Sequence, residues 1–336
     1  MERSGLELGS LDGGCHLYFA ESLDSFVKDL QRARPTVFIS VPRLLLKFQQ
    51  GVLAKMPAPK LDRLLAIPVL GHFVRRKIQK GLGLHAVRVC GSGSAPLSVD
   101  LLRWYDRLGI RLIEGYGMTE LASASHMTET GPDWWGTVGR PGDGVDQRID
   151  PQTGEVQVLS PGATLGYYKA PELTAELFTA DGWLRTGDKG EIDAAGRLRL
   201  VGRIKDNFKS SKGKYVAPAP IEHKLIQNLS LDACLVIGAG LNQPVGIVVL
   251  NEAAIARLPA ARAAIEEDLA NHLRAVNATL DPHEKLDYLV ITTKAWTPEN
   301  GMLTPTLKAK RASIEKHFAA HLETWGARHA PVVWDE

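Results

Sequence analysis

Two short segments combine glycines with side chains suited to binding a nucleotide. Residues 91–96 read Gly-Ser-Gly-Ser-Ala-Pro, and residues 114–120 read Glu-Gly-Tyr-Gly-Met-Thr-Glu. Glycines, which lack a Cβ, let backbone N–H groups come close to a planar ring or a phosphate. Tyr116 can stack on a base, Thr119 offers a hydroxyl, and Glu120 offers the hard carboxylate oxygen that Mg²⁺ prefers. Each segment alone would equally suit a structural turn, with Glu120 in solvent.

Strand and helix signals alternate through the first 120 residues and place both segments at strand ends. A β-branched run predicts a strand, and Pro42 predicts the start of a helix. The predicted elements are a helix over 24–34, strands over 36–41, 85–90 and 110–114, and helices over 43–54 and, capped by Ser98, to Leu108. This order is typical of an α/β layer with a largely parallel sheet. Ligands of such sheets bind beyond the carboxyl ends of the strands.

The composition changes at about Gly131, where glycine and proline become frequent and the predicted strands short. These strands cover 147–149, 155–159, 190–193 and 198–201, and residues 193–197 predict a hairpin turn. A small antiparallel barrel or sheet is therefore expected, before mixed helix and strand signals return after Gly202. We expect residues 1–202 and 203–336 to form two domains, the first divided into an α/β layer over 1–130 and a small β subdomain over 131–202.

The overall composition excludes several classes of protein. The chain has 336 residues, 44% of them hydrophobic, as in an ordinary globular protein. Its 40 basic and 38 acidic residues leave a net charge of +2, which gives no electrostatic argument for a nucleic-acid partner. Cys15, Cys90 and Cys234 lack metal-site spacing, which argues against zinc and fits a reducing compartment. Residues 1–11 lack the apolar region of a secretory signal, so a cytoplasmic location is expected.

One apolar segment, residues 64–74, is followed directly by Arg75, Arg76 and Lys77. Pro68 interrupts it, and it is too short to span a bilayer. We expect it to be buried or packed under a lid. The alternative is peripheral contact with the inner membrane face, which the basic flank keeps open.

Four segments, in order, resemble motifs of the acyl-adenylate-forming, or AMP-binding, superfamily. Residues 114–120 resemble its YGMTE motif, 182–188 its W-x-x-TGD segment, and 202–206 its GRxKD hinge. Residues 303–311 resemble the lysine motif of the long-chain fatty acyl-CoA synthetase branch, and residues 208–222 are also like that fatty-acid-activating branch. The resemblance implies an α/β fold: part of a large adenylation domain with a small β-barrel-like subdomain, followed by a smaller α+β C-terminal lid domain.

The resemblance also implies a role for individual residues. Asp188 and Arg203 would contact the ribose of AMP, where a carboxylate can accept hydrogen bonds from both hydroxyls. Thr119 would contact the α-phosphate, and Glu120 would hold Mg²⁺. Ser94, Ala95 and Pro96 would line the adenine, with Tyr116 against its face. The other implied nucleotide-binding residues are Glu114, Gly115, Gly117 and Met118.

Lys308 would bridge the carboxylate substrate and the nucleotide, where negative charge concentrates during adenylation. The family motif usually has serine and glycine before this lysine, whereas this chain has Thr306 and Leu307, as the long-chain branch does. The alternative is that Lys308 belongs to a solvated basic cluster with Lys310 and Arg311.

The implied reaction has two steps, with ATP, Mg²⁺ and CoA as cofactors and substrates. A fatty acid attacks ATP to give acyl-AMP and pyrophosphate, and the CoA thiol then displaces AMP. The resemblance implies that the lid rotates between the steps about Lys205. Gly213 would let the pantetheine arm pass, and Lys212 would meet a CoA phosphate, with Lys209 nearby. The alternative is a solvated basic loop of Lys209, Lys212 and Lys214.

The Ser/Thr/Gly-rich phosphate loop of the family is not found before Glu114. The chain therefore resembles the C-terminal portion of a longer enzyme, without the half that carries this loop. Two other functions stay open: an adenylating enzyme that loads a carrier protein, and a catalytically silent AMP-binding fragment.

Overall fold

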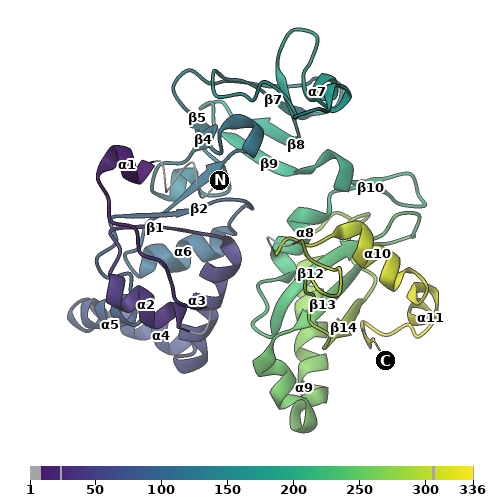
Figure 1. The fold of residues 1–336 in the computed structure, drawn as a ribbon. Helices are drawn as coiled ribbons and strands as arrows, with labels where there is room; N and C mark the ends of the chain where they lie inside the picture. Colours follow the sequence, from purple (N-terminus) through teal and green to yellow (C-terminus); the bar gives the residue numbers. More distant parts are fainter. Residues whose placement is uncertain (1–8, 23–24, 305–306, 336) are drawn as a thin grey trace. The chain divides into compact units, whose positions relative to one another are not determined.

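The computed structural model describes residues 9–22, 25–304 and 307–335. It divides into two compact units, Met1–Leu200 and Val201–Glu336. Figure 1 follows the chain by colour, from the first unit in purple, blue and teal to the second unit in green and yellow. Each unit is described here by itself.

The first unit is built on a five-stranded sheet in the order β1-β2-β3-β4-β5. The strands are β1 (Val37–Ser40), β2 (Val89–Ser92), β3 (Leu112–Tyr116), β4 (His126–Met127) and β5 (Arg140–Pro141). The first three are parallel, and the register places Ser40 beside Ser92 and Ser92 beside Glu114. This confirms the predicted α/β layer. Side chains alternate across it: Phe38 and Cys90 are buried, whereas Ile39 is about half exposed on the opposite face.

Within the described residues of this part of the chain, six α-helices flank the strands in sequence. They are α1 (Gly9–Gly13), α2 (Phe26–Ala33), α3 (Pro42–Lys55), α4 (Ala58–Ala66), α5 (Pro68–Gly81) and α6 (Val99–Arg107). α3 and α5 begin on proline, which has no N–H to leave unpaired in a first turn. The predicted cap of α6 is confirmed, because Ser98 Oγ accepts a hydrogen bond from Leu101 N at 3.2 Å.

The second and third strands begin later than predicted. The expected strand over 85–90 is β2 at Val89–Ser92, and the expected strand over 110–114 is β3 at Leu112–Tyr116. Gly91 and Ser92, predicted as a turn, pair with Ile39 and Ser40 instead. Pairing with neighbouring strands therefore outweighs the low local strand propensity of glycine and serine.

The small β subdomain is a four-stranded sheet in the order β6-β7-β8-β9. Its strands are β6 (Asp146–Ile149), β7 (Glu155–Leu159), β8 (Leu184–Ile192) and β9 (Leu198–Arg203), and helix α7 (Pro171–Leu177) precedes β8. The predicted hairpin turn is confirmed, since Asp193 N donates to Arg197 O at 3.0 Å and Gly196 has φ of 76°. β8 is longer than predicted and contains the whole Thr186-Gly187-Asp188 segment.

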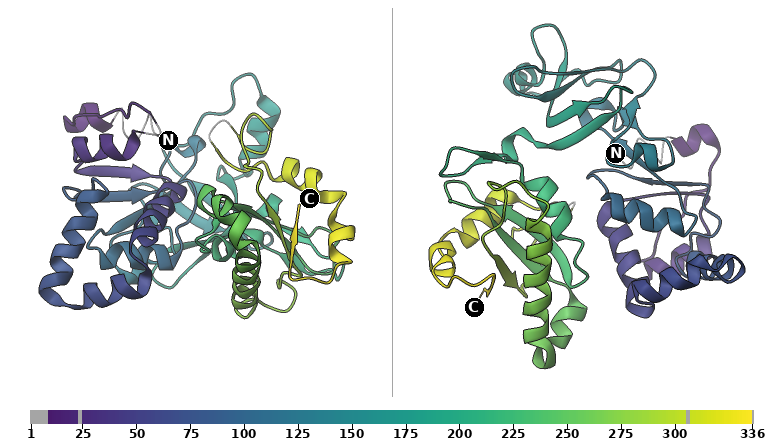
Figure 2. Two further views of the ribbon diagram at one scale, coloured as in Figure 1. Left: turned by 90° about the horizontal axis from the view of Figure 1, so that it is seen from below. Right: turned by 180° about the vertical axis from the view of Figure 1, so that it is seen from behind.

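The second unit contains a four-stranded sheet whose strands are covered on both faces. Its order is β12 (Leu231–Ile237), β13 (Val245–Leu250), β14 (Leu289–Thr292) and β15 (Val332–Trp334), and all residues of β13 and β14 are buried. Helices α8 (Pro218–Leu225) and α9 (Glu252–Asn277) pack on one face, and α10 (Arg311–Ala319) and α11 (Leu322–Gly326) pack on the other (Figures 1 and 2). A short hairpin, β10 (Phe208–Lys209) and β11 (Tyr215–Val216), precedes α8.

The apolar segment 64–74 forms the end of α4 and the start of α5. Its side chains are not buried as expected: Val69 is 72% exposed, Phe73 66% and Ile67 50%. Burial inside the first unit is therefore not found for these three residues, and within the segment Leu65 and Gly71 are the buried positions. Packing of the segment under a lid stays a prediction. Within the described ranges, the structure has no helix with the length and hydropathy of a membrane span.

Candidate nucleotide site and lid

The loop that follows β2 is anchored by a buried glutamate on the next strand. Leu97 N donates to Glu114 Oε1 at 2.7 Å, and Glu114 is only 4% exposed. Burial raises the pKa of Glu114 to about 7, and the hydrogen bond from Leu97 acts in the opposite direction. Within the loop, Ser94 has φ of 73°, a left-handed conformation that favours glycine. Glu114 thus holds the segment of Ser94, Ala95 and Pro96 against the end of β3.

Tyr116 and Asp188, 72 residues apart in sequence, meet in the structure. Tyr116 Oη donates to Asp188 Oδ2 at 2.8 Å, and Tyr116 is 8% exposed. The two side chains come from different sheets, β3 and β8, so sequence spacing alone could not pair them. Gly117, which follows, has a packing reason for being glycine, since a Cβ there would lie 2.5 Å from Ser123 O.

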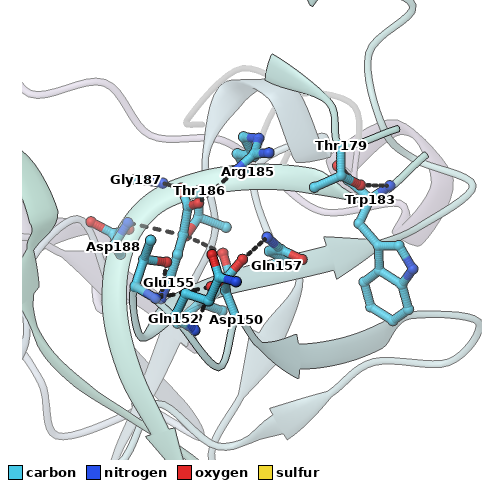
Figure 3. Close-up of polar contacts among 12 residues, drawn as sticks. Asp150, Gln152, Glu155, Gln157, Thr179, Trp183, Arg185, Thr186, Gly187 and Asp188 are labelled. Atoms are coloured by element: carbon cyan, nitrogen blue, oxygen red, sulfur yellow. Dashed lines mark hydrogen bonds and ion pairs between the residues drawn. The ribbon is translucent and has the colours of Figure 1, made fainter. Parts of the chain in front are cut away.

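A second buried glutamate, Glu155 on β7, holds the backbone just before Asp188 (Figure 3). Its Oε1 accepts a hydrogen bond from Gly187 N at 2.8 Å, and its Oε2 lies 3.4 Å from Arg185 Nη1. Gly187 has φ of 71°, a left-handed conformation that favours glycine, at the point where the pairing of β8 with β7 is irregular. Sequence reasoning missed Glu155. The available signal was a charged residue at the start of a strand in which valines alternate with polar residues.

Glu120 lies in a short 3₁₀ helix, η2 (Thr119–Leu121), and has a tyrosine partner that the sequence did not indicate. Tyr167 Oη donates to Glu120 Oε1 at 2.7 Å, and this bond raises the pKa of Tyr167. Thr164 N also donates to Glu120 O at 2.7 Å. The loop before α7 therefore holds Glu120 at both its backbone and its side chain. Thr119 is exposed beside it.

The carboxylate of Glu120 fits a cation that is bound mainly through a ligand's phosphates. Mg²⁺ commonly uses one or two carboxylates together with substrate phosphates and water. Across the described residues, no group of three His, Cys, Asp or Glu side chains forms a separate metal cage. Glu120 would supply one carboxylate to such an ion, and the remaining ligands would have to come from phosphates and water.

In the second unit, the predicted hinge and CoA residues lie on short elements before α8. Arg203 ends β9, and Lys205 lies in the 3₁₀ helix η4 (Ile204–Asp206). Lys212 is exposed in the turn between β10 and β11, and Gly213 there has φ of 76°. Lys209 Nζ lies 5.7 Å from the centre of the Tyr215 ring.

Lys308 is exposed on a tight loop before α10. Thr304 N donates to Lys308 O at 2.8 Å, and Lys308 N donates to Thr304 Oγ1 at 3.0 Å. Leu307 has φ of 60°. Glycine adopts this conformation more readily than leucine, which is consistent with the glycine that the family motif usually has there. Pro305 and Thr306 of this motif lie outside the described residues.

Arg311 does not belong to a solvated basic cluster, so that alternative is wrong for this residue. Its side chain is 17% exposed, and Nη2 lies 2.7 Å from Glu222 Oε1. Nη1 donates to Val236 O at 2.8 Å, and Nε lies 3.7 Å from Asp206 Oδ2. Arg311 thus connects the start of α10 to α8, to β12 and to the hinge segment.

Comparison with known proteins identifies the family of this chain. Residues 1–168 match the AMP-binding enzyme family, and residues 205–328 match the AMP-binding enzyme C-terminal domain. The chain belongs to the AMP-binding enzyme family. It is 30% identical to the peroxisomal long chain acyl-CoA synthetase 6 of Arabidopsis thaliana, over 87% of this chain and 48% of that protein. It is 31% identical to a putative fatty-acid–CoA ligase of Mycobacterium tuberculosis, over 74% of this chain and 46% of that protein.

Solved structures of the AMP-binding family show the same fold. The adenylation domain of a carboxylate reductase from Mycobacterium chelonae matches with a TM-score of 0.79 and 27% identity, over 95% of this chain and 51% of that one. An adenylation and carrier didomain of a carboxylic acid reductase from Segniliparus rugosus, in complex with AMP, matches with a TM-score of 0.76 and 26% identity, over 96% of this chain and 46% of that one. The chain spans about half the length of these relatives.

Proposed function

We propose that this chain provides the ribose-binding, lysine and lid residues of an ATP-dependent fatty acid–CoA ligase. Such an enzyme converts a fatty acid to acyl-AMP and transfers the acyl group to CoA. The observation that supports this most is the joining of Tyr116 and Asp188 from two sheets, in a family whose similar members include long-chain acyl-CoA synthetases. A buried tyrosine that binds a carboxylate fixes the orientation in which that carboxylate can accept two ribose hydroxyls.

In this proposal the first unit binds AMP. Asp188 accepts hydrogen bonds from the ribose, and the loop of Ser94, Ala95 and Pro96 lines the adenine with Tyr116. Thr119 contacts the α-phosphate. Glu120 holds Mg²⁺, which offsets phosphate charge when bound. Tyr167 orients the Glu120 carboxylate through its hydrogen bond to Oε1.

The second unit supplies the residues of the lid. Arg203 reaches the ribose, and Lys308 neutralises the carboxylate and phosphate as they approach each other. Lys205 is the hinge about which the unit rotates. The turn with Lys212 and Gly213, together with Lys209, receives CoA.

The adenylate site is tested by titration calorimetry with AMP. Replacing Asp188 with alanine should weaken binding by about 1.5–3 kcal/mol, as expected for a hydrogen bond to a charged group. Asp143→Ala is the matched control, because Asp143 is an exposed aspartate of the same unit. Equal AMP affinity in wild type and Asp188→Ala would remove Asp188 from the site.

The lysine assignment is tested by separating the two half-reactions. Lys308→Ala should slow ATP–pyrophosphate exchange by about a hundredfold, the effect typical of one electrostatic contact. CoA consumption from supplied acyl-AMP should stay near the wild-type rate, because the carboxylate and phosphate no longer have to be brought together. A comparable loss in both assays would instead indicate a role in folding.

A carrier protein is the second candidate for the acyl acceptor. It is supported by the likeness to the reductase didomain, which joins an adenylation domain to a carrier domain. CoA and a phosphopantetheinylated carrier, offered in parallel with the same acyl-AMP, would distinguish the two acceptors. AMP binding without pyrophosphate release or acyl transfer would favour a catalytically silent fragment.

A further inference from the structure

The α4–α5 helix pair concentrates positive charge around an exposed apolar tip. Residues 58–81 carry six basic residues and one acidic residue, a net charge of +5, whereas the whole chain has a net charge of +2. The six basic residues are Lys60, Arg63, Arg75, Arg76, Lys77 and Lys80. The tip, which we define as Ile67, Val69, Leu70 and Phe73, is between 42% and 72% exposed at each residue.

The helix pair is held firmly to the rest of its unit. Arg75 Nε donates to Arg107 O at 2.9 Å, and Arg76 Nη1 donates to His85 O at 3.1 Å. On α4, Asp62 pairs with Arg107 Nη2 at 2.7 Å. Gly71 allows the close crossing of the two helices, because a Cβ there would lie 2.7 Å from Leu65 O. The exposed tip is therefore presented by a fixed scaffold.

Apolar and basic side chains follow one another along the same face of α5. Val69, Phe73 and Lys77 are spaced four residues apart, and Lys80 is three residues further, so they share a face. An amphipathic helix lies in the plane of a bilayer interface with its apolar face buried by about 5–10 Å. In that orientation Val69 and Phe73 face the acyl boundary, and the long side chains of Lys77 and Lys80 can extend to the lipid headgroups.

We propose that this tip docks on an anionic phospholipid surface. Phe73 and Val69 enter the interface, and the basic residues behind them bind lipid phosphates. Charge favours an anionic lipid surface over a second copy of the chain as the partner. Two copies that met at this site would bring together two α4–α5 pairs, each with a net charge of +5 over residues 58–81, and these would repel each other. Docking of the tip on lipid needs no bound nucleotide, so it can be tested independently of the proposed ligase activity.

The test is binding of the purified chain to sedimented vesicles of phosphatidylcholine containing about a quarter phosphatidylglycerol. Val69→Ser/Phe73→Ser should weaken partitioning by about tenfold or more, because two apolar side chains lose their burial. Leu165→Ser/Tyr168→Ser is the matched control, since Leu165 and Tyr168 are 102% and 88% exposed elsewhere in the same unit. The control should bind as wild type does.

Charge and depth are tested separately. Lys77→Glu/Lys80→Glu should abolish the preference for anionic over neutral vesicles, whereas Lys285→Glu, an exposed site in the second unit, should retain it. A Phe73→Trp variant should show a blue-shifted emission when vesicles are added. The proposal is overturned if wild type does not bind, if both serine pairs weaken binding equally, or if sedimentation velocity shows that the tip instead joins two chains.

Discussion

Glu114 in the first unit and Glu222 in the second do the same structural task in different electrostatic settings. Glu114 is buried and Glu222 is half-buried, and each accepts a backbone N–H from another segment at 2.7 Å, Leu97 N for Glu114 and Val236 N for Glu222. Glu222 is paired with Arg311, but the described side chains give Glu114 no cation. Burial raises the pKa of both carboxyls, and at Glu222 the charge of Arg311 acts against this.

The difference teaches where each unit is sensitive. A buried carboxylate that is paired with an arginine can stay ionised, but its contribution to folding stability is lost when the arginine is removed. A buried carboxyl without a nearby cation is more stable in its protonated form, so its contribution to folding stability depends on pH. The second unit is therefore expected to lose stability when one partner of the pair is removed, and the loop over residues 93–97 is expected to lose stability when the pH rises.

The largest effect is expected from breaking the pair in the second unit. Arg311→Met leaves the half-buried Glu222 carboxylate without its arginine, and the loss of folding stability should approach the lower end of the about 3–5 kcal/mol that breaking a fully buried pair costs. Denaturant unfolding of the second unit measures the loss. Arg328→Met is the control, because Arg328 is exposed. Adding Glu222→Met to Arg311→Met should recover most of the stability, and equal stability of the two arginine variants would contradict the comparison.

The second-largest effect is expected from Glu114, which makes the folding stability of the first unit depend on pH. The pKa of Glu114 is about 7 in the fold against an ordinary 4.5, so the folded state keeps this proton to higher pH than the unfolded chain. Its contribution is fully present below pH 4.5 and is lost as pH rises to about 7. The loss amounts to about 3 kcal/mol at roughly 1.36 kcal/mol per pKa unit.

Glu114→Gln keeps the shape and cannot ionise, so its unfolding free energy should lack this slope. Unfolding of wild type and variant across the same pH window gives the difference. Glu129→Gln, at an exposed position of the same unit, should behave as wild type does. Parallel stability curves for wild type and Glu114→Gln would show that Glu114 is ionised throughout.

The smallest effect should appear as local opening, reported by the buried Cys90 and the half-buried Cys234. Cys90 lies on β2 and is 1% exposed, and Cys234 Sγ donates to Glu222 O at 3.3 Å. Each kcal/mol lost locally raises the open population about fivefold. Arg311→Met should therefore speed thiol labelling of Cys234 but not of Cys90, and Glu114→Ala should do the reverse. Cys15, which is exposed, monitors the reagent. Labelling that rises at both cysteines in either variant would mean that the two regions open together.

The sequence by itself determined the alternation of elements and the local backbone requirements. Strand and helix periodicity, the Ser98 cap and the hairpin at Asp193 are set by residues within a few positions of each other, so they could be predicted. The glycine segments and the four ordered motifs identified the family for the same reason, because each motif is contiguous. Strand limits were less well predicted, since they depend on which neighbours a strand pairs with.

Only the tertiary structure decided which distant side chains meet. Tyr116 reaches Asp188, Glu155 holds Gly187, Tyr167 reaches Glu120, and Arg311 pairs with Glu222. Each of these contacts joins elements that are far apart in the chain, and their burial sets the charge state of the carboxyls. The tertiary structure also decided which side chains are exposed to solvent. Segment 64–74 is apolar enough for a core, but most of its side chains are exposed in the α4–α5 pair. Local composition specifies which side chains prefer burial, whereas packing decides which of them are buried.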